Sequence, residues 1–235
     1  MTEEVLNTPL KRDYKTEFLQ GMKMGIPIVV GFIPVAIAFA IMAKESGMTG
    51  LQAILMSAMV FAGASQIMAT GMIAAGASTI SMIVATFILN LRHLIMSTCV
   101  VNQMEKTKLG LKLLACFGIT DETFAVFTSD SKNFSLWYFF GLALMAYSSW
   151  VLGTVLGVVA SDILPQIVSD SFGIALYALF IALLVPNVKK SLRLGIIVIF
   201  TGLMNWILLK WLPSGWALIV ATLLGAWIGV WVVED

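Results

Sequence analysis

The side chains best suited to chemistry are Asn90, Arg92 and His93, which lie together inside a long apolar stretch. An arginine within a membrane is costly unless it is paired or hydrated, so Arg92 needs a substrate or a partner. His93 is the single histidine of the chain, and an imidazole exchanges protons near neutral pH. Asn90 and His93 would share a helix face, with Arg92 rotated away from both. The cluster predicts carboxylate binding by Arg92 and proton handling by His93. The alternative is a structural network in which Arg92 pairs an acid and His93 bonds a carbonyl.

A second polar group interrupts the preceding apolar stretch, where the sequence reads Phe61-Ala-Gly-Ala-Ser-Gln66. Gly63 and its small neighbours let another helix or a ligand approach the backbone. The amide of Gln66 is costly in lipid if unpaired, so it is predicted to point into the protein. With the Ser65 hydroxyl and exposed backbone, it could meet the charged groups of an amino acid. An interhelical hydrogen bond made by Gln66 is the alternative.

Two acids, Asp121 and Glu122, lie in a weaker apolar stretch directly after Thr120. This order is typical of a helix N-terminus, where the helix dipole favours acidic side chains. It predicts either a cap at the membrane surface or a functional carboxylate. In the second case the acid would pair with Arg92 or take up a proton during transport.

The first apolar stretch contains Pro27, Gly31 and Pro34. Each proline removes a backbone donor and frees a carbonyl in the preceding turn, and inside a membrane such carbonyls need another partner or a water-lined cavity. The pattern predicts either a broken helix along a substrate path or a kinked packing helix.

Composition places these residues in a membrane. The chain is 60% hydrophobic and 11% charged, against roughly 25% charged residues in soluble domains. No basic stripe indicates nucleic acid, and Cys99 and Cys116 form no metal or redox motif. No metal cluster, nucleophile elbow or phosphate loop is recognisable. We therefore predict a protein that is not an enzyme and holds no metal or cofactor.

The polar groups lie in long apolar stretches, and a helix needs about 20 apolar residues to cross the hydrocarbon core. We therefore expect membrane helices to position them. We predict a cytoplasmic tail over residues 1–20 and a single transmembrane domain over 21–235, with a weaker apolar stretch at 109–128. The predicted spans are 23–43, 52–75, 79–101, 135–160, 171–188, 192–211 and 215–233.

Basic residues make the count of crossings ambiguous. The tail, the segment with Lys106, Lys108 and Lys112, and the segment with Lys189 and Arg193 all favour the cytoplasm. Three apolar segments separate the first two clusters, yet both ends inside require an even number of crossings. The segment 52–75 is therefore predicted to be broken or re-entrant, and eight plain crossings are the alternative. The fold class is an all-α membrane bundle of about seven segments.

An internal repeat is also predicted. The stretch that starts at Gly50 resembles the one that starts at Phe172, and each precedes a helix-breaking group. Inverted repeats of this kind are common in secondary transporters.

The three motifs Phe61–Gln66, Asn90–His93 and Thr120–Glu122, in this order after a Gly-x-Pro span, resemble the AzlC family. This family comprises the large subunits of bacterial branched-chain amino acid exporters, also called the YgaZ or BrnF type. The resemblance covers the chain from about Gly21 onward. By position, the motif residues of the family correspond to Gln66, Asn90, Arg92, His93, Asp121 and Glu122.

The resemblance implies a multi-pass protein of the bacterial cell membrane that exports branched-chain amino acids. It also implies proton coupling and a small partner membrane subunit of the AzlD type. Two alternatives remain open on the residues alone. The chain could be a channel or facilitator without ion coupling, or an assembly subunit that moves nothing.

Overall fold

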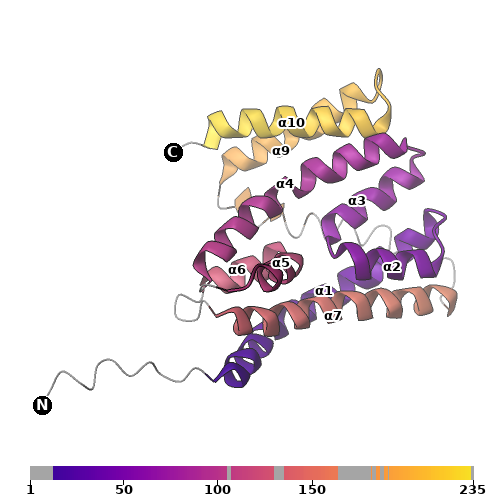
Figure 1. Ribbon diagram of the computed structural model, residues 1–235. Coiled ribbons are helices and arrows are strands. Elements are labelled where there is room, and N and C mark those ends of the chain that lie inside the picture. The colour runs from indigo at the N-terminus through magenta and orange to yellow at the C-terminus, as the bar shows by residue number, and fades with distance from the viewer. Residues whose placement is uncertain are drawn as a thin grey trace, which may run out of the picture. The chain divides into compact units, whose positions relative to one another are not determined.

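The computed structural model describes residues 13–104, 107–129, 135–163, 181, 184–185, 188–189 and 191–233. Within these ranges the chain forms helices and no strand, which confirms the all-α class (Figure 1). The helices are α1 (Tyr14–Glu45), α2 (Gly50–Val60), α3 (Gly63–Ala74), α4 (Thr79–Gln103), α5 (Leu109–Phe117), α6 (Asp121–Ser129), α7 (Leu136–Ile163), α9 (Leu192–Leu208) and α10 (Ser214–Val233).

Four described helices, α1, α4, α7 and α10, are long and apolar enough to cross a membrane. Large apolar side chains lie exposed along them, among them Ile95 at 75% and Trp231 at 70%. Such surfaces suit lipid rather than water, since soluble monomers rarely expose contiguous apolar patches. The predicted span 171–188 lies almost wholly outside the described residues, so the count of about seven segments stays a prediction.

Two predicted apolar segments are each divided into a pair of short helices. The segment 52–75 forms α2 and α3, separated at Phe61 and Ala62, and the segment 109–128 forms α5 and α6. These helices have 9 to 12 residues. At about 1.5 Å per residue, each is at most about 18 Å long, well short of the roughly 30 Å hydrocarbon core. The predicted break in 52–75 is therefore present.

Phe61 makes the sharp turn between α2 and α3. Its backbone has φ 45° and ψ 46°, the left-handed region that bulky residues rarely adopt. No other non-glycine residue in the described ranges has a positive φ. Its ring is 3% exposed, so packing of the ring holds the strained turn in place.

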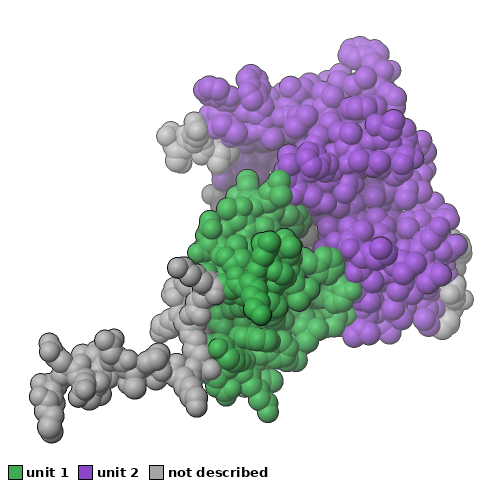
Figure 2. All heavy atoms as spheres, viewed as in Figure 1, with its two compact units in different colours: residues 1–32, 93–150 green, residues 33–92, 151–235 purple. Residues whose placement is uncertain are grey.

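The chain divides into two compact units, coloured separately in Figure 2. Unit 1 comprises residues 1–32 and 93–150, and unit 2 comprises residues 33–92 and 151–235. The boundaries fall inside α1, α4 and α7, so these helices contribute to both units. The single transport domain over 21–235, with a tail over 1–20, stays a prediction, and α1 already begins at Tyr14.

In unit 1, α1 and α7 run in the same direction with their backbones in close contact. A Cβ atom at Gly21 would overlap the carbonyl of Tyr138, and one at Gly25 would lie 2.7 Å from the Cβ of Met145. At the start of both helices, Ser135 donates a hydrogen bond of 2.5 Å to the Glu17 carboxylate. Small residues allow this close packing, as is usual between membrane helices.

In unit 2, the same two helices continue in contact, because a Cβ at Gly153 would lie 2.7 Å from that of Ala36. The helix α1 runs without interruption through Pro27 and Pro34, so the broken helix that was one expectation there is absent. Contacts with α7 on both sides of the prolines, at Gly25 and Ala36, support the continuous helix. Whether α1 lines a substrate path stays a prediction.

The pair α2–α3 is a hairpin within unit 2. Its open ends lie on one side and the break forms its tip (Figure 1). The outer ends contact neighbouring helices. A Cβ at Gly50 would lie 2.5 Å from Val158 of α7, and one at Gly215, in the first turn of α10, would lie 2.8 Å from Met72 of α3. The tip is thereby placed deep in the unit, next to the middle of α4 and α7.

Candidate functional site

Buried and half-buried polar side chains from four helices gather around the break between α2 and α3. Ser65 donates a hydrogen bond to Asn90 Oδ1 at 2.7 Å, and Gln66 Nε2 donates to Ser57 Oγ at 3.1 Å. Ser57 Oγ in turn lies 2.7 Å from Thr154 Oγ1 of α7. Ser57, Gln66 and Thr154 are each 0% exposed and Ser65 is 2% exposed. Buried polar groups that are joined in this way specify one arrangement of the helices.

The N-terminus of α3 faces this polar group without a side-chain cap. Its N-cap residue is Ala62, which makes no side-chain hydrogen bond to the helix. The first backbone N–H groups of a helix have no acceptor within it, and the dipole makes that end electropositive. The first turn contains Gly63 and Ser65. A carboxylate is the kind of group that such an uncapped end binds.

Asn90 contacts the first turn of α3 through Ser65 and carries two further amide donors. Its Oδ1 accepts the hydrogen bond from Ser65, so the two Nδ2 hydrogens lie on the opposite edge of the amide. The structure thus brings Ser65, Gln66 and Asn90 together. The Gln66 amide bonds to Ser57, which lies in the same predicted segment 52–75, so the alternative of a bond from Gln66 to another span stays a prediction.

Arg92 and His93 lie on α4 immediately after Asn90, and both side chains are half-buried. Arg92 belongs to unit 2 and His93 to unit 1. Two positions along a helix correspond to a rotation of about 200°, so Arg92 points away from the face that carries Asn90. The roles predicted for Arg92 and His93 stay predictions.

Asp121 and Glu122 open α6 in unit 1, and both side chains are exposed. The N-terminus expected there is capped by two threonines. Thr120 N donates to Thr123 Oγ1 at 2.8 Å, and Thr123 N donates to Thr120 Oγ1 at 3.2 Å. The expected helix start is therefore present. Pairing of either acid with Arg92, which belongs to the other unit, stays a prediction.

Ser57 and Thr154 are the members of the polar group that sequence reasoning missed. Both are isolated hydroxyls in apolar stretches, and 97 positions separate them. Nothing in a single sequence indicates which distant side chain a buried hydroxyl contacts. The nearest signal is Gly153 beside Thr154, a small residue where α1 and α7 pack closely.

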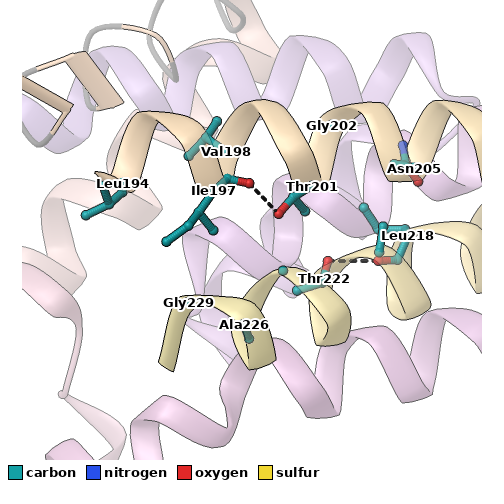
Figure 3. Close-up of a pocket in the computed structure, with 12 residues that line it drawn as sticks. Leu194, Ile197, Val198, Thr201, Gly202, Asn205, Leu218, Thr222, Ala226 and Gly229 are labelled. Carbon is teal, nitrogen blue, oxygen red and sulfur yellow. Dashed lines mark hydrogen bonds between the residues drawn. The ribbon is translucent and has the colours of Figure 1, made fainter. Parts of the chain in front are cut away.

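A groove lies between α9 and α10 in unit 2 (Figure 3). It has a volume of about 560 Å³ and is lined largely by small and aliphatic residues. Its two threonines bond to their own helices, Thr201 to Ile197 O and Thr222 to Leu218 O, both at 2.8 Å. Asn205 also lines the groove, and its buried Oδ1 has no hydrogen-bond partner among the described residues, so the groove offers one amide where the group around α3 offers two.

Comparison with known proteins gives a consistent match. The AzlC protein family model matches residues 27–164, which include every element of the polar group. An uncharacterized membrane protein of Archaeoglobus fulgidus is 38% identical over 73% of this chain and 76% of its own length. The inner membrane protein YgaZ of Escherichia coli is 30% identical over 88% of this chain and 87% of its own. The branched-chain amino acid transport protein AzlC of Bacillus subtilis is 25% identical over 74% and 69%. No solved structure matches the chain.

Proposed function

Because this chain belongs to the AzlC family, we propose that it exports branched-chain amino acids across the bacterial cell membrane. Similarity to transport proteins and the apolar helices establish a membrane protein of a transport family. The substrate, the direction and the coupling are the parts that the proposal adds. The substrate rests on the polar group around the break in unit 2, and the direction and the coupling rest on the resemblance to the AzlC family.

The arrangement of donors and acceptors around α3 carries the proposal. An amino acid has a carboxylate that needs donors and an ammonium group that needs an acceptor. The uncapped start of α3 and Asn90 Nδ2 supply donors. Gln66 directs its Nε2 toward Ser57, so its carbonyl oxygen is the amide atom on the other side. The pair of amides thus matches both ends of a zwitterion.

In this proposal the buried polar group is a substrate site in its closed state. Gln66 is 0% exposed and Ser65 is 2% exposed, so a ligand reaches them only when the surrounding helices separate. Alternating exposure of one buried site is how secondary transporters work. The aliphatic side chain would be held by apolar residues, and leucine and isoleucine would be poorly distinguished, by about 1–3 kcal/mol.

We assign proton coupling to His93, Asp121 and Glu122. An imidazole and two carboxylates are the groups in these motifs that exchange protons at accessible pH. Arg92 is assigned to the substrate carboxylate or to one of these acids. A small membrane subunit of the AzlD type completes the exporter in this proposal.

Uptake of labelled leucine into inverted vesicles, with the small subunit co-expressed, tests the function. Uptake that rises with an imposed pH gradient supports the exporter. Saturable uptake that ignores the gradient would identify a facilitator instead. If leucine is neither taken up nor raises the melting temperature of the purified protein, the chain is an assembly subunit.

A further inference from the structure

We propose that Ser57 and Thr154 are positioning residues that fix which edge of the Gln66 amide faces the substrate. The inference rests on the proposed function, because it concerns the same site. It assigns a role to two hydroxyls that touch no predicted substrate atom. Their effect is transmitted through Gln66.

The hydrogen bonds link α3 to α7 through Ser57 of α2. Gln66 Nε2 can only donate, so Ser57 Oγ is the acceptor at 3.1 Å. Ser57 Oγ and Thr154 Oγ1 are 2.7 Å apart, close enough for a strong hydroxyl–hydroxyl bond. If Thr154 were replaced by an apolar residue, Ser57 would lose the partner that holds its oxygen in place.

A glutamine amide is nearly symmetric in shape, so its environment must decide which end is nitrogen and which is oxygen. Ser57 alone could accept from Nε2 or donate to Oε1. In this proposal Ser57 Oγ donates its proton to Thr154 Oγ1, so it can only accept from Gln66, and Oε1 is directed away from Ser57. A carbonyl oxygen has two lone pairs, so it can accept from an ammonium group alongside another contact.

The direction of the hydrogen bond between Gln66 and Ser57 therefore determines whether the site prefers a substrate with an amine. We call the linked side chains Gln66, Ser57 and Thr154 the relay. A reversed amide would present N–H donors. These repel an ammonium group and instead donate hydrogen bonds to a carbonyl or a carboxylate. Loss of the relay should weaken discrimination between leucine and its α-keto acid, 4-methyl-2-oxopentanoate. The two compounds share the carboxylate and the aliphatic chain and differ at the amine.

The test measures half-saturation for leucine and inhibition by 4-methyl-2-oxopentanoate in vesicles carrying the full chain. In Ser57→Ala and Thr154→Val we expect the preference for leucine to fall about tenfold, the size of one lost orienting hydrogen bond. Ser57→Thr, which keeps the hydroxyl, should restore most of the preference. In a Gln66→Leu background, Ser57→Ala should cause no further loss, since linked residues are not additive.

Two matched controls separate positioning from burial of a hydroxyl. Ser149 is 3% exposed and bonds to Ala146 O at 2.8 Å, and Thr70 is 1% exposed and bonds to Ile67 O at 2.7 Å. Ser149→Ala and Thr70→Val should leave the preference unchanged.

Three outcomes would overturn the proposals, and those against the positioning role are distinguishable from the one against the function. If wild-type protein takes up leucine but Ser57→Ala and Thr154→Val keep its preference, or match their controls, the positioning role is wrong while the transport function stands. The positioning role is equally wrong if Ser57→Ala and Gln66→Leu multiply their effects. Wild-type protein that does not recognise leucine would refute the proposed function itself.

Discussion

The two broken segments of this chain begin their second helices in opposite ways. In unit 2, α3 starts after Ala62 with no side-chain cap, and buried amides and hydroxyls surround its first turn. In unit 1, Thr120 and Thr123 cap α6 reciprocally, and Thr123 also donates to Gly118 O at 3.0 Å. A capped helix start has already satisfied the N–H groups that an anion would need. The start of α3 therefore still has N–H groups that suit a ligand, whereas the N–H groups at the start of α6 already serve the cap.

Both pairs are otherwise alike in construction. The ring of Phe117, at the end of α5, lies 5.8 Å from that of Tyr147, and the ring of Phe127 in α6 lies 5.3 Å from that of Phe139. The second half-helix thus runs back along α7, as α3 runs back along α4. The pairs differ at the break, where Phe61 has φ 45° and Gly118 has φ −80°, and in the side chains that surround it.

The largest effect is expected at the buried amide of α3. Gln66→Leu removes the acceptor proposed for the ammonium group, and hydrogen bonds to charged groups contribute about 1.5–3 kcal/mol. Leucine half-saturation should therefore rise about 10- to 150-fold in vesicle uptake. Thr70→Val, a buried change in the same helix, should leave it unaltered. If leucine half-saturation is unchanged in Gln66→Leu, the substrate site does not lie at α3.

Giving α3 the kind of cap that α6 has should have the next largest effect. Ala62→Ser supplies a side-chain acceptor for the first-turn N–H groups and so competes with a substrate carboxylate. We expect leucine half-saturation to rise about tenfold while the melting temperature stays level or increases, since a serine cap is worth about 1 kcal/mol over alanine. Ala62→Gly adds no acceptor and is the control. Tighter leucine binding in Ala62→Ser would contradict the carboxylate assignment.

Sequence reasoning anticipated the break in 52–75 because the basic clusters required an even number of crossings. If the pair α2–α3 does not cross, α1 and α4 are the two long helices between the tail and Lys106, and the number of crossings there is even. The repeat proposed between Gly50 and Phe172 involves residues outside the described ranges. The structure instead places a second broken pair at α5–α6, which the sequence indicated only as a weak span.

The polar site was predictable in part. Ser65, Gln66 and Asn90 are polar residues in apolar stretches, and their cost in lipid points them inward. Their pairing depends on how α3 and α4 lie against each other, which no local pattern determines. Ser57 and Thr154 were missed for the same reason, since their contact is set by tertiary packing. The helix α1 also continues through two prolines, which disfavour a helix interior, because it packs on α7.

A smaller effect, on stability alone, is expected at the capped start of α6. Thr123 is 0% exposed and serves both the cap and the Gly118 carbonyl. Thr123→Val should destabilise unit 1 by about 1–2 kcal/mol, because a cap and a buried bond are lost. The melting temperature should fall, while leucine half-saturation should stay within twofold of wild type. A large change in half-saturation would show that the two broken pairs are functionally alike after all.

The smallest effect is expected at a third helix start, the exposed one of α1. Thr16 Oγ1 donates to Asp13 Oδ2 at 2.6 Å and Lys15 N to Asp13 Oδ1 at 3.1 Å. The hydrogen bond from Thr16, supported by that from Lys15, lowers the pKa of Asp13 from its ordinary value. Because the folded pKa is the lower one, the stabilisation is present above the ordinary pKa of an aspartate and disappears as the pH falls through the lowered value.

Asp13→Asn tests this start against the other two. Wild type should melt slightly above the variant at pH 7, and the difference should vanish as the pH falls below the pKa of Asp13. Leucine uptake should not respond, because an exposed cap outside the polar group holds no substrate. A difference in melting temperature that persists at low pH would mean that Asp13 acts through something other than its charge. A loss of uptake would mean that the start of α1, rather than α3 alone, takes part in transport.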